Sequence, residues 1–153
     1  VAAPDQLALI KSADPGLAAS KKLVFDMYRA IVNAGRHDLA PKFFTPEYIQ
    51  HNPNVKSGRD QLVDYIRKTR PVRPIPETIG FPVISIMAEG DMVLVASVEY
   101  NDDPEKAGTK YATTHFDLYR IEKGLIAEHW DNVLKSKAAL STDPNVTNKP
   151  NTP

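Results

Sequence analysis

The chain has 153 residues, 19 Lys and Arg against 19 Asp and Glu, and no cysteine. This length is typical of one domain that buries a core without cross-links. The absence of cysteine excludes a disulfide scaffold, a thiolate metal site and a cysteine nucleophile. Because the charges balance and no apolar run approaches the length of a membrane span, we expect neither nucleic-acid nor membrane binding.

The two ends of the chain differ from its middle. We predict an N-terminal extension over residues 1–13, one domain over 14–136 and a flexible tail over 137–153. The start at Val1 could follow removal of a signal peptide or be an arbitrary boundary of the sequence. A glycosylation acceptor pattern at Asn145 matters only in a secreted protein. These features slightly favour an extracytoplasmic location over a cytoplasmic one.

Helical patterns occupy the first half of the chain. Asp14-Pro15 is a helix start, apolar residues then recur at helical spacing, and Gly35 is a stop. A second, short helix is expected from Asp38 until Pro46 ends it, followed by a short extended segment over 47–51. A third helix follows Ser57-Gly58-Arg59-Asp60, which is close to a capping box. A proline-rich linker then separates this half from the next.

Strand patterns occupy the second half. Tight-turn signals at Glu89-Gly90-Asp91 and Glu122-Lys123-Gly124 each join two segments rich in β-branched residues, and a polar loop is expected over 101–108. The four predicted strands cover residues 83–87, 92–100, 111–121 and 125–134. Helices followed by an antiparallel meander predict an α+β fold in which the sheet curls around the helices.

Imidazole and carboxylate side chains gather in the last two strands. Alternation places His115, Asp117 and Tyr119 on one face of their strand, and His129 and Asp131 on one face of the next. If that face is concave, the protein has a pocket with groups able to move protons. The alternative is that these polar side chains face solvent on the convex side.

A metal site is an alternative interpretation of the histidines and carboxylates. His51, His115, Asp117 and His129 offer imidazole and carboxylate ligands. The helical His-x-x-x-His spacing and paired cysteines are absent, so we expect no metal and no cofactor. Phosphate-binding glycine loops and the Gly-x-Ser-x-Gly elbow are absent as well, which leaves nucleotide binding and serine hydrolase chemistry unsupported.

Two segments resemble a known family. Tyr48-Ile49-Gln50-His51-Asn52-Pro53 with Gly58, and then the stretch from Asp117 to Asp131, are similar to the SnoaL-like branch of the NTF2-like superfamily. The resemblance implies a cone of curved antiparallel sheet around helices, with a mostly apolar pocket and a homodimer formed through the sheet. SnoaL-like polyketide cyclases close a ring by intramolecular aldol condensation without metal or cofactor. The implied ligand is a small apolar or carbonyl-containing molecule.

The resemblance also implies roles for individual residues. Asp131 matches the family's acid/base aspartate, and His115 or His51 would polarise the carbonyl group or orient Asp131. Where many relatives have a histidine in the third strand, this chain reads Val95-Ala96-Ser97-Val98-Glu99. The residues expected to contact the substrate are Tyr48, Gln50, Asp117, Tyr119, His129 and Trp130.

Two other functions stay open. The same cone with a carboxylate base supports an isomerase or a dehydratase. A non-catalytic protein that binds a small apolar ligand, or serves as a dimerisation module, is the other alternative. An enclosed Asp131 within hydrogen-bond reach of an imidazole would favour an enzyme, and a pocket lined only by apolar groups would favour binding.

Overall fold

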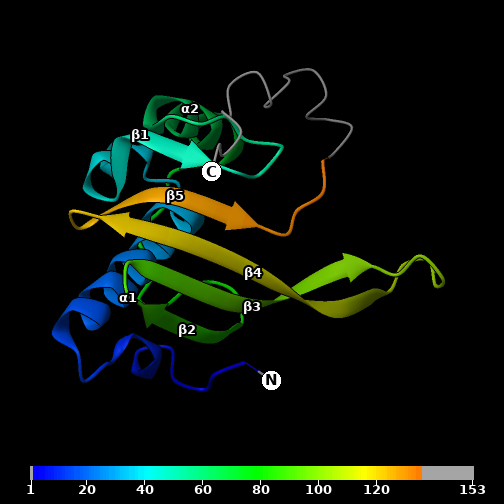
Figure 1. Ribbon diagram of the computed structural model, residues 1–153. Coiled ribbons are helices and arrows are strands. Elements are labelled where there is room, and N and C mark those ends of the chain that lie inside the picture. Colours follow the sequence, from blue (N-terminus) through cyan, green and yellow to red (C-terminus); the bar gives the residue numbers. More distant parts are fainter. Residues whose placement is uncertain (1, 136–153) are drawn as a thin grey trace, which may run out of the picture.

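The computed structural model describes residues 2–135, in which helices precede most of the strands (Figure 1). The predicted tail over 137–153, with its acceptor pattern at Asn145, lies outside the described residues. No helix among residues 2–135 is long and apolar enough to cross a membrane. The helical elements are η1 (Ala8–Ile10), α1 (Pro15–Met27), η2 (Tyr28–Asn33), η3 (His37–Lys42) and α2 (Arg59–Thr69). The strands are β1 (Phe44–Gln50), β2 (Val83–Glu89), β3 (Met92–Asp102), β4 (Lys110–Glu122) and β5 (Leu125–Asp131).

The first helix has the predicted start and stop. The Asp14 carboxylate accepts hydrogen bonds from the backbone N–H groups of Gly16 and Leu17, and Pro15 opens α1. The helix widens into the π-helical turns of η2. Gly35 follows with φ of 61°, and a Cβ there would lie 2.6 Å from the carbonyl oxygen of Pro71. Only glycine therefore lets the proline-rich linker pass so close to the helix end.

Two local predictions for the next elements are wrong. The second helix is a 3₁₀ helix that ends at Lys42, and Pro46 lies within β1 instead of ending a helix. Because β1 is an edge strand, it tolerates a residue without an N–H donor. At α2 the N-cap is Gly58, with no side-chain cap. The Ser57 hydroxyl, placed in the predicted capping box, accepts a hydrogen bond from the Gln50 N–H.

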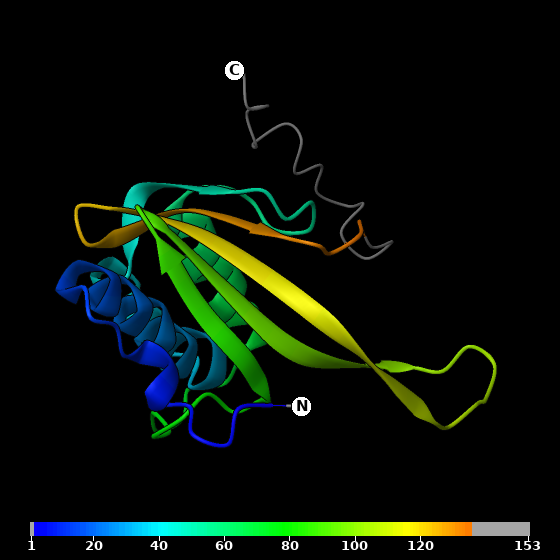
Figure 2. The same cartoon turned by 60° about the horizontal axis from the view of Figure 1, so that its bottom comes forward.

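The five strands form one sheet in the order β1-β5-β4-β3-β2. The meander β2 to β5 is antiparallel as predicted, whereas β1 pairs with β5 in parallel. The sequence analysis expected an antiparallel sheet throughout and so did not include this parallel pair. Figure 2 shows the sheet bending, with α1 and α2 on the same side of it. This arrangement is the expected α+β cone.

The core lies between the concave sheet face and the helices. It includes Val24 and Ile31 from the helices and Val93, Val95 and Ile126 from the strands, each at most 1% exposed. Burial of these side chains supplies the main stabilising term of the fold.

The N-terminal segment packs against this body. The Gln6 side chain donates to the Ile79 carbonyl oxygen at 3.1 Å and accepts from the Ile79 N–H at 2.8 Å. The Ala3 N–H donates to the Val83 carbonyl at 2.8 Å. Gln6 and Ala3 therefore attach the N-terminal segment to the linker before β2 and to β2 itself.

The β3–β4 hairpin is longer than its neighbours. β2 pairs with β3 only as far as Ser97, and β5 pairs with β4 only as far as Asp117. The rest of the hairpin projects from the body as a two-stranded ribbon (Figure 1). The predicted loop is consequently shorter, because Asn101 and Asp102 belong to β3.

Candidate active site

A cavity of about 560 Å³ lies between the concave sheet face and the helices. α1, η2 and α2 contribute apolar side chains, among them Met27, Ile31 and Leu62. β4 and β5 contribute the opposite, polar part of the lining. The polar residues of these two strands are His115, Asp117, Tyr119, His129 and Asp131.

Strand register brings the polar residues together. Asp117 lies directly opposite Asp131, and Tyr119 lies opposite His129. The register shift in this pair falls between Arg120 and Ile121, beyond these four positions, so strict alternation holds where the side chains gather. The predicted imidazole and carboxylate group therefore faces the cavity, and the solvent-facing alternative is wrong.

Asp117 is the hydrogen-bonding centre of this group. Its Oδ1 lies 2.8 Å from His129 Nε2 and 3.3 Å from His115 Nε2, and its Oδ2 accepts from the Tyr28 hydroxyl at 2.5 Å. Burial alone would raise the pKa of Asp117, but the hydrogen bonds from His115, His129 and Tyr28 outweigh it. The net effect holds the pKa of Asp117 well below its usual range, so this carboxylate stays ionised.

His115 and Asp131 share the cavity wall beside Asp117. One ligand atom of each of these three residues lies within 4.8 Å of the others. The Asp131 carboxylate accepts from Asn52 Nδ2 at 2.6 Å and from the Val133 N–H at 3.2 Å. The hydrogen bond to Asp117 raises the pKa of His115 above its ordinary value, in spite of partial burial. The His115 imidazole and the Asp131 carboxylate therefore lie within 4.8 Å of each other, although no hydrogen bond joins them among residues 2–135.

His129 is held from three sides. Its Nδ1 lies 2.9 Å from Gln50 Oε1, and its Nε2 lies 2.8 Å from Asp117 Oδ1. Its ring stacks on Tyr119 with centroids 4.6 Å apart. With no polar ring atom left over, His129 orients the others and is poorly placed to take a proton from a ligand.

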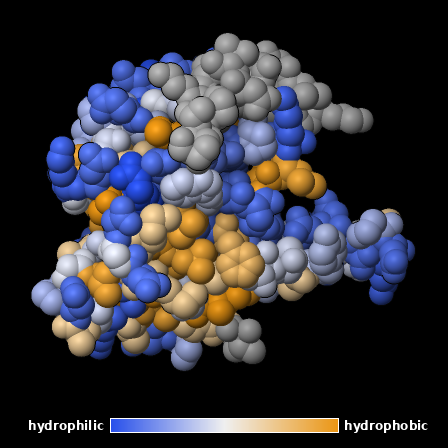
Figure 3. All heavy atoms as spheres, in the orientation of Figure 1, coloured by the Kyte–Doolittle hydropathy of each residue, from blue (hydrophilic) through white to orange (hydrophobic). Residues whose placement is uncertain are grey.

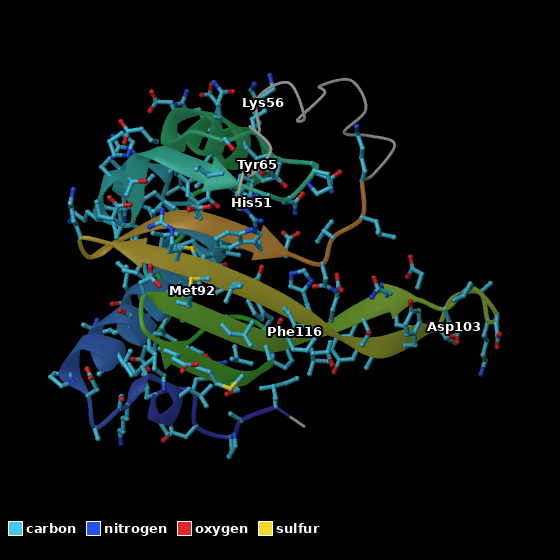
Figure 4. The ribbon with its side chains drawn as sticks, in the orientation of Figure 1. His51, Lys56, Tyr65, Met92, Asp103 and Phe116 are labelled. Atoms are coloured by element: carbon cyan, nitrogen blue, oxygen red, sulfur yellow. The ribbon has the colours of Figure 1, made fainter. Side chains whose placement is uncertain are left out.

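The structure does not bring His51 and Trp130 to the cavity, where the sequence analysis expected them. Their rings stack on each other with centroids 4.6 Å apart, and neither residue lines the cavity. His51 Nε2 lies 3.1 Å from Glu128 Oε2, and Arg120 donates to the other oxygen of Glu128 at 2.7 Å. Because His51 follows Gln50 and Trp130 follows His129, alternation turns both toward the outer face. Figure 4 shows His51 beside β5.

The sequence analysis did not predict several residues of the cavity, among them Tyr28, Asn52 and Ser97. Tyr28 was taken as a core position of the first helix, although its hydroxyl reaches Asp117. Asn52 lies in the recognised motif and contacts Asp131. Ser97 belongs to the third-strand segment near which the family resemblance implied a histidine; it lies opposite His115 in the register and lines the cavity. A hydroxyl at an otherwise apolar helix position was the one signal that could have identified Tyr28.

His115, Asp117 and Asp131 are the residues of this site that could ligate a metal. Both oxygens of Asp117 already accept hydrogen bonds, however, and its Oδ1 is approached by two imidazoles. A metal ion would have to displace these donors from the carboxylate. The arrangement fits proton transfer better than metal ligation.

The fold and the cavity define the class of protein, a cone-shaped α+β domain with a cluster of imidazole and carboxylate side chains inside. The sequence matches the family model of the SnoaL-like domain over residues 24–129. This chain therefore belongs to the SnoaL-like family, whose members generally bind small molecules. A comparison with curated proteins finds no match.

Solved structures with the same fold are distant in sequence. TsrD from Streptomyces laurentii is 22% identical, with a TM-score of 0.52 over 79% of this chain and 90% of that one. A SnoaL-like polyketide cyclase candidate from Jannaschia sp. CCS1 is 17% identical, with a TM-score of 0.56 over 88% and 98%. An LEH-like epoxide hydrolase from M. tuberculosis is 14% identical, with a TM-score of 0.52 over 74% and 80%. At these identities the likeness extends to the fold alone.

Proposed function

We propose that this protein is a cofactor-independent acid/base catalyst that acts on a small carbonyl compound, in a reaction of the aldol condensation or cyclisation type. The observation that carries the proposal is the placement of His115 and Asp131 together on the wall of a largely apolar cavity. Aldol chemistry needs a base for the proton α to a carbonyl group and a donor for the oxygen. The site offers one of each.

The hydrogen bonds favour Asp131 as the base. Asp117 is ionised, but its oxygens are occupied by Tyr28, His115 and His129. Asp131 accepts two hydrogen bonds, from Asn52 and Val133, so its carboxylate keeps acceptor capacity, and it lines the cavity. Asp117 is thus a positioning residue that keeps His115 protonated through Nε2. Nδ1 of His115 lies 3.8 Å from Glu99 Oε2, beyond hydrogen-bond distance, at the wall of the same cavity.

The experiment is deuterium exchange into the methyl group of acetophenone, followed by NMR in D₂O. We expect wild-type protein to accelerate exchange over buffer and Asp131→Asn to abolish the acceleration while remaining folded. Asp64→Asn, a change to a half-exposed carboxylate on α2, is the matched control and should keep the rate. Full exchange activity in Asp131→Asn would show that another group is the base.

The pH profile of exchange adds a second readout. Because the pKa of His115 is raised, its proton is held beyond pH ~6.5, the ordinary midpoint for histidine. The rate should therefore fall only as pH rises through this higher value, and that alkaline limb should vanish in His115→Gln. Exchange reports on proton abstraction, which is also the first step of isomerisation and dehydration. Protein that binds the ketone without accelerating exchange would support the non-catalytic alternative.

The homodimer implied by the family resemblance is also proposed here. The sheet face away from the helices carries apolar side chains, and Figure 3 shows apolar atoms gathered over the middle of this face. Met87 is 50% exposed and Phe116 46% exposed, and Figure 4 places Phe116 on this face. An apolar face of this kind is usually covered by a partner. A second copy presenting the same face would cover it symmetrically.

A further inference from the structure

Three buried tyrosines line the cavity, and two of them use their hydroxyl protons within the protein. Tyr119 donates to the Tyr28 oxygen at 2.9 Å, and Tyr28 donates to Asp117 Oδ2. Neither proton is available to a ligand unless this chain of hydrogen bonds is broken.

The hydroxyl of Tyr48 is different. It accepts a hydrogen bond from Gln50 Nε2 at 3.0 Å, and it has no acceptor for its own proton among residues 2–135. Tyr48 is only 2% exposed, so an acceptor for that proton has to come from the cavity. Its side chain lines the cavity that also holds His115 and Asp131. A buried hydroxyl with an unused proton indicates an acceptor on the ligand.

The direction of this hydrogen bond is determined by the backbone. The Asn52 N–H can only donate, and it lies 2.9 Å from one end of the Gln50 side-chain amide. That end is therefore the oxygen Oε1, which also accepts from His129 Nδ1. The other end, Nε2, must donate to Tyr48. A hydroxyl that receives a hydrogen bond is a stronger donor in turn, because the bonds polarise one another.

We propose that Tyr48 is a catalytic residue that donates its hydroxyl hydrogen bond to the oxyanion of an enolate formed in the cavity, with Gln50 as its positioning residue. This inference rests on the proposed function. Asp131 takes the α-proton, the C–H electron pair forms the C=C bond, and the carbonyl π pair moves to oxygen. Tyr48 keeps its proton and only shares it with that oxygen. The substrate class is an enolisable ketone or β-diketone whose oxygen is unhindered.

The surroundings keep Tyr48 in the donor form. Burial, and then the negative charges of Asp131 and Asp117, raise the pKa of Tyr48 well above its ordinary value. The hydroxyl therefore remains protonated throughout the physiological pH range. It can donate to a developing negative charge, which is the state that catalysis must stabilise.

The experiment uses 1-phenylbutane-1,3-dione, whose enolate absorbs in the near ultraviolet. When the dione is bound to wild-type protein, it should show the enolate band at a pH where the free dione is neutral. In Tyr48→Phe the affinity for the enolate should fall about tenfold to a hundredfold, the effect of one hydrogen bond to a charged group. The affinity for butylbenzene, which has a similar shape and no oxygen, should not change. Tyr111→Phe, on the projecting ribbon, is the matched control.

The other outcomes contradict either the role of Tyr48 or the proposed function. Equal enolate affinity in wild type and Tyr48→Phe, or equal losses for the dione and butylbenzene, would overturn the role of Tyr48. The Asp131→Asn exchange result would decide the proposed function independently. If Tyr48→Phe does not fold, the wild-type spectrum still decides, because a bound dione that ionises no more readily than in water refutes an oxyanion site.

Discussion

Replacing Asp117 by asparagine tests the hydrogen-bonding centre of the cavity. The carboxylate accepts from Tyr28 on one oxygen and faces His115 and His129 on the other. The asparagine amide has the same shape but carries one N–H₂ group. Whichever way the amide is flipped, this donor faces Tyr28 or the two histidines. The variant therefore loses an ionic pairing and leaves a buried donor without an acceptor.

The magnitude follows from burial. The side chains of Asp117 and His129 are 11% and 10% exposed, so water screens their interaction little. Breaking a buried pair of this kind costs about 3 kcal/mol of unfolding free energy. For a chain of this size the loss lowers the Tm by roughly 6–12 °C. Asp64→Asn, which removes a pair with Arg67 between side chains more than half exposed, should cost less than about 0.5 kcal/mol.

Urea unfolding at several pH values is the assay, and the sign of the pH dependence can be stated. The lowered pKa of Asp117 contributes stability that is complete above pH ~3.9 and is lost as pH falls below that value. The raised pKa of His115 contributes stability that is complete below pH ~6.5 and is lost as pH rises through the folded value. Wild type and Asp117→Asn should therefore differ most between these limits. A difference below about 0.5 kcal/mol, or one that is constant with pH, would refute the reasoning.

Two further predictions concern the outer face of the sheet. His51→Ala should lower the unfolding free energy by about 1 kcal/mol, because the stack on Trp130 is lost, and should leave ketone exchange unchanged. Slower exchange in this variant would contradict the position of His51 outside the cavity. Phe116→Asp should convert the proposed homodimer to a monomer in sedimentation velocity with little change in the urea midpoint. A monomeric wild type would contradict the proposal that this face forms a homodimer.

Alternation along the last two strands was enough to group the site residues. It correctly placed His115 and Asp117 on one face and His129 and Asp131 on the adjoining one. A period of two tells which side chains share a face, but it does not tell which face is inside. That choice depends on where α1 and α2 pack, which is a tertiary feature. The sequence analysis therefore left open whether the group was enclosed.

The same rule was not applied to the first strand, and there the prediction failed. Tyr48 and Gln50 lie two residues apart and share the cavity side, whereas His51 turns to the other face. Taking the recognised motif as one unit put all three residues in the pocket. The parallel pairing of β1 with β5, which sets Gln50 opposite His129, has no local signal because it depends on a contact about 80 residues away along the chain.

The two aspartates of the site show why it needs so many polar neighbours. Asp117 and Asp131 lie directly opposite each other on adjacent strands, an arrangement that repulsion between like charges would normally disfavour. The imidazoles of His115 and His129 lie beside Asp117 and offset its negative charge, which lessens that repulsion. Asp117 is thus the carboxylate that organises the proton donors, and Asp131 is the one that we propose as the base.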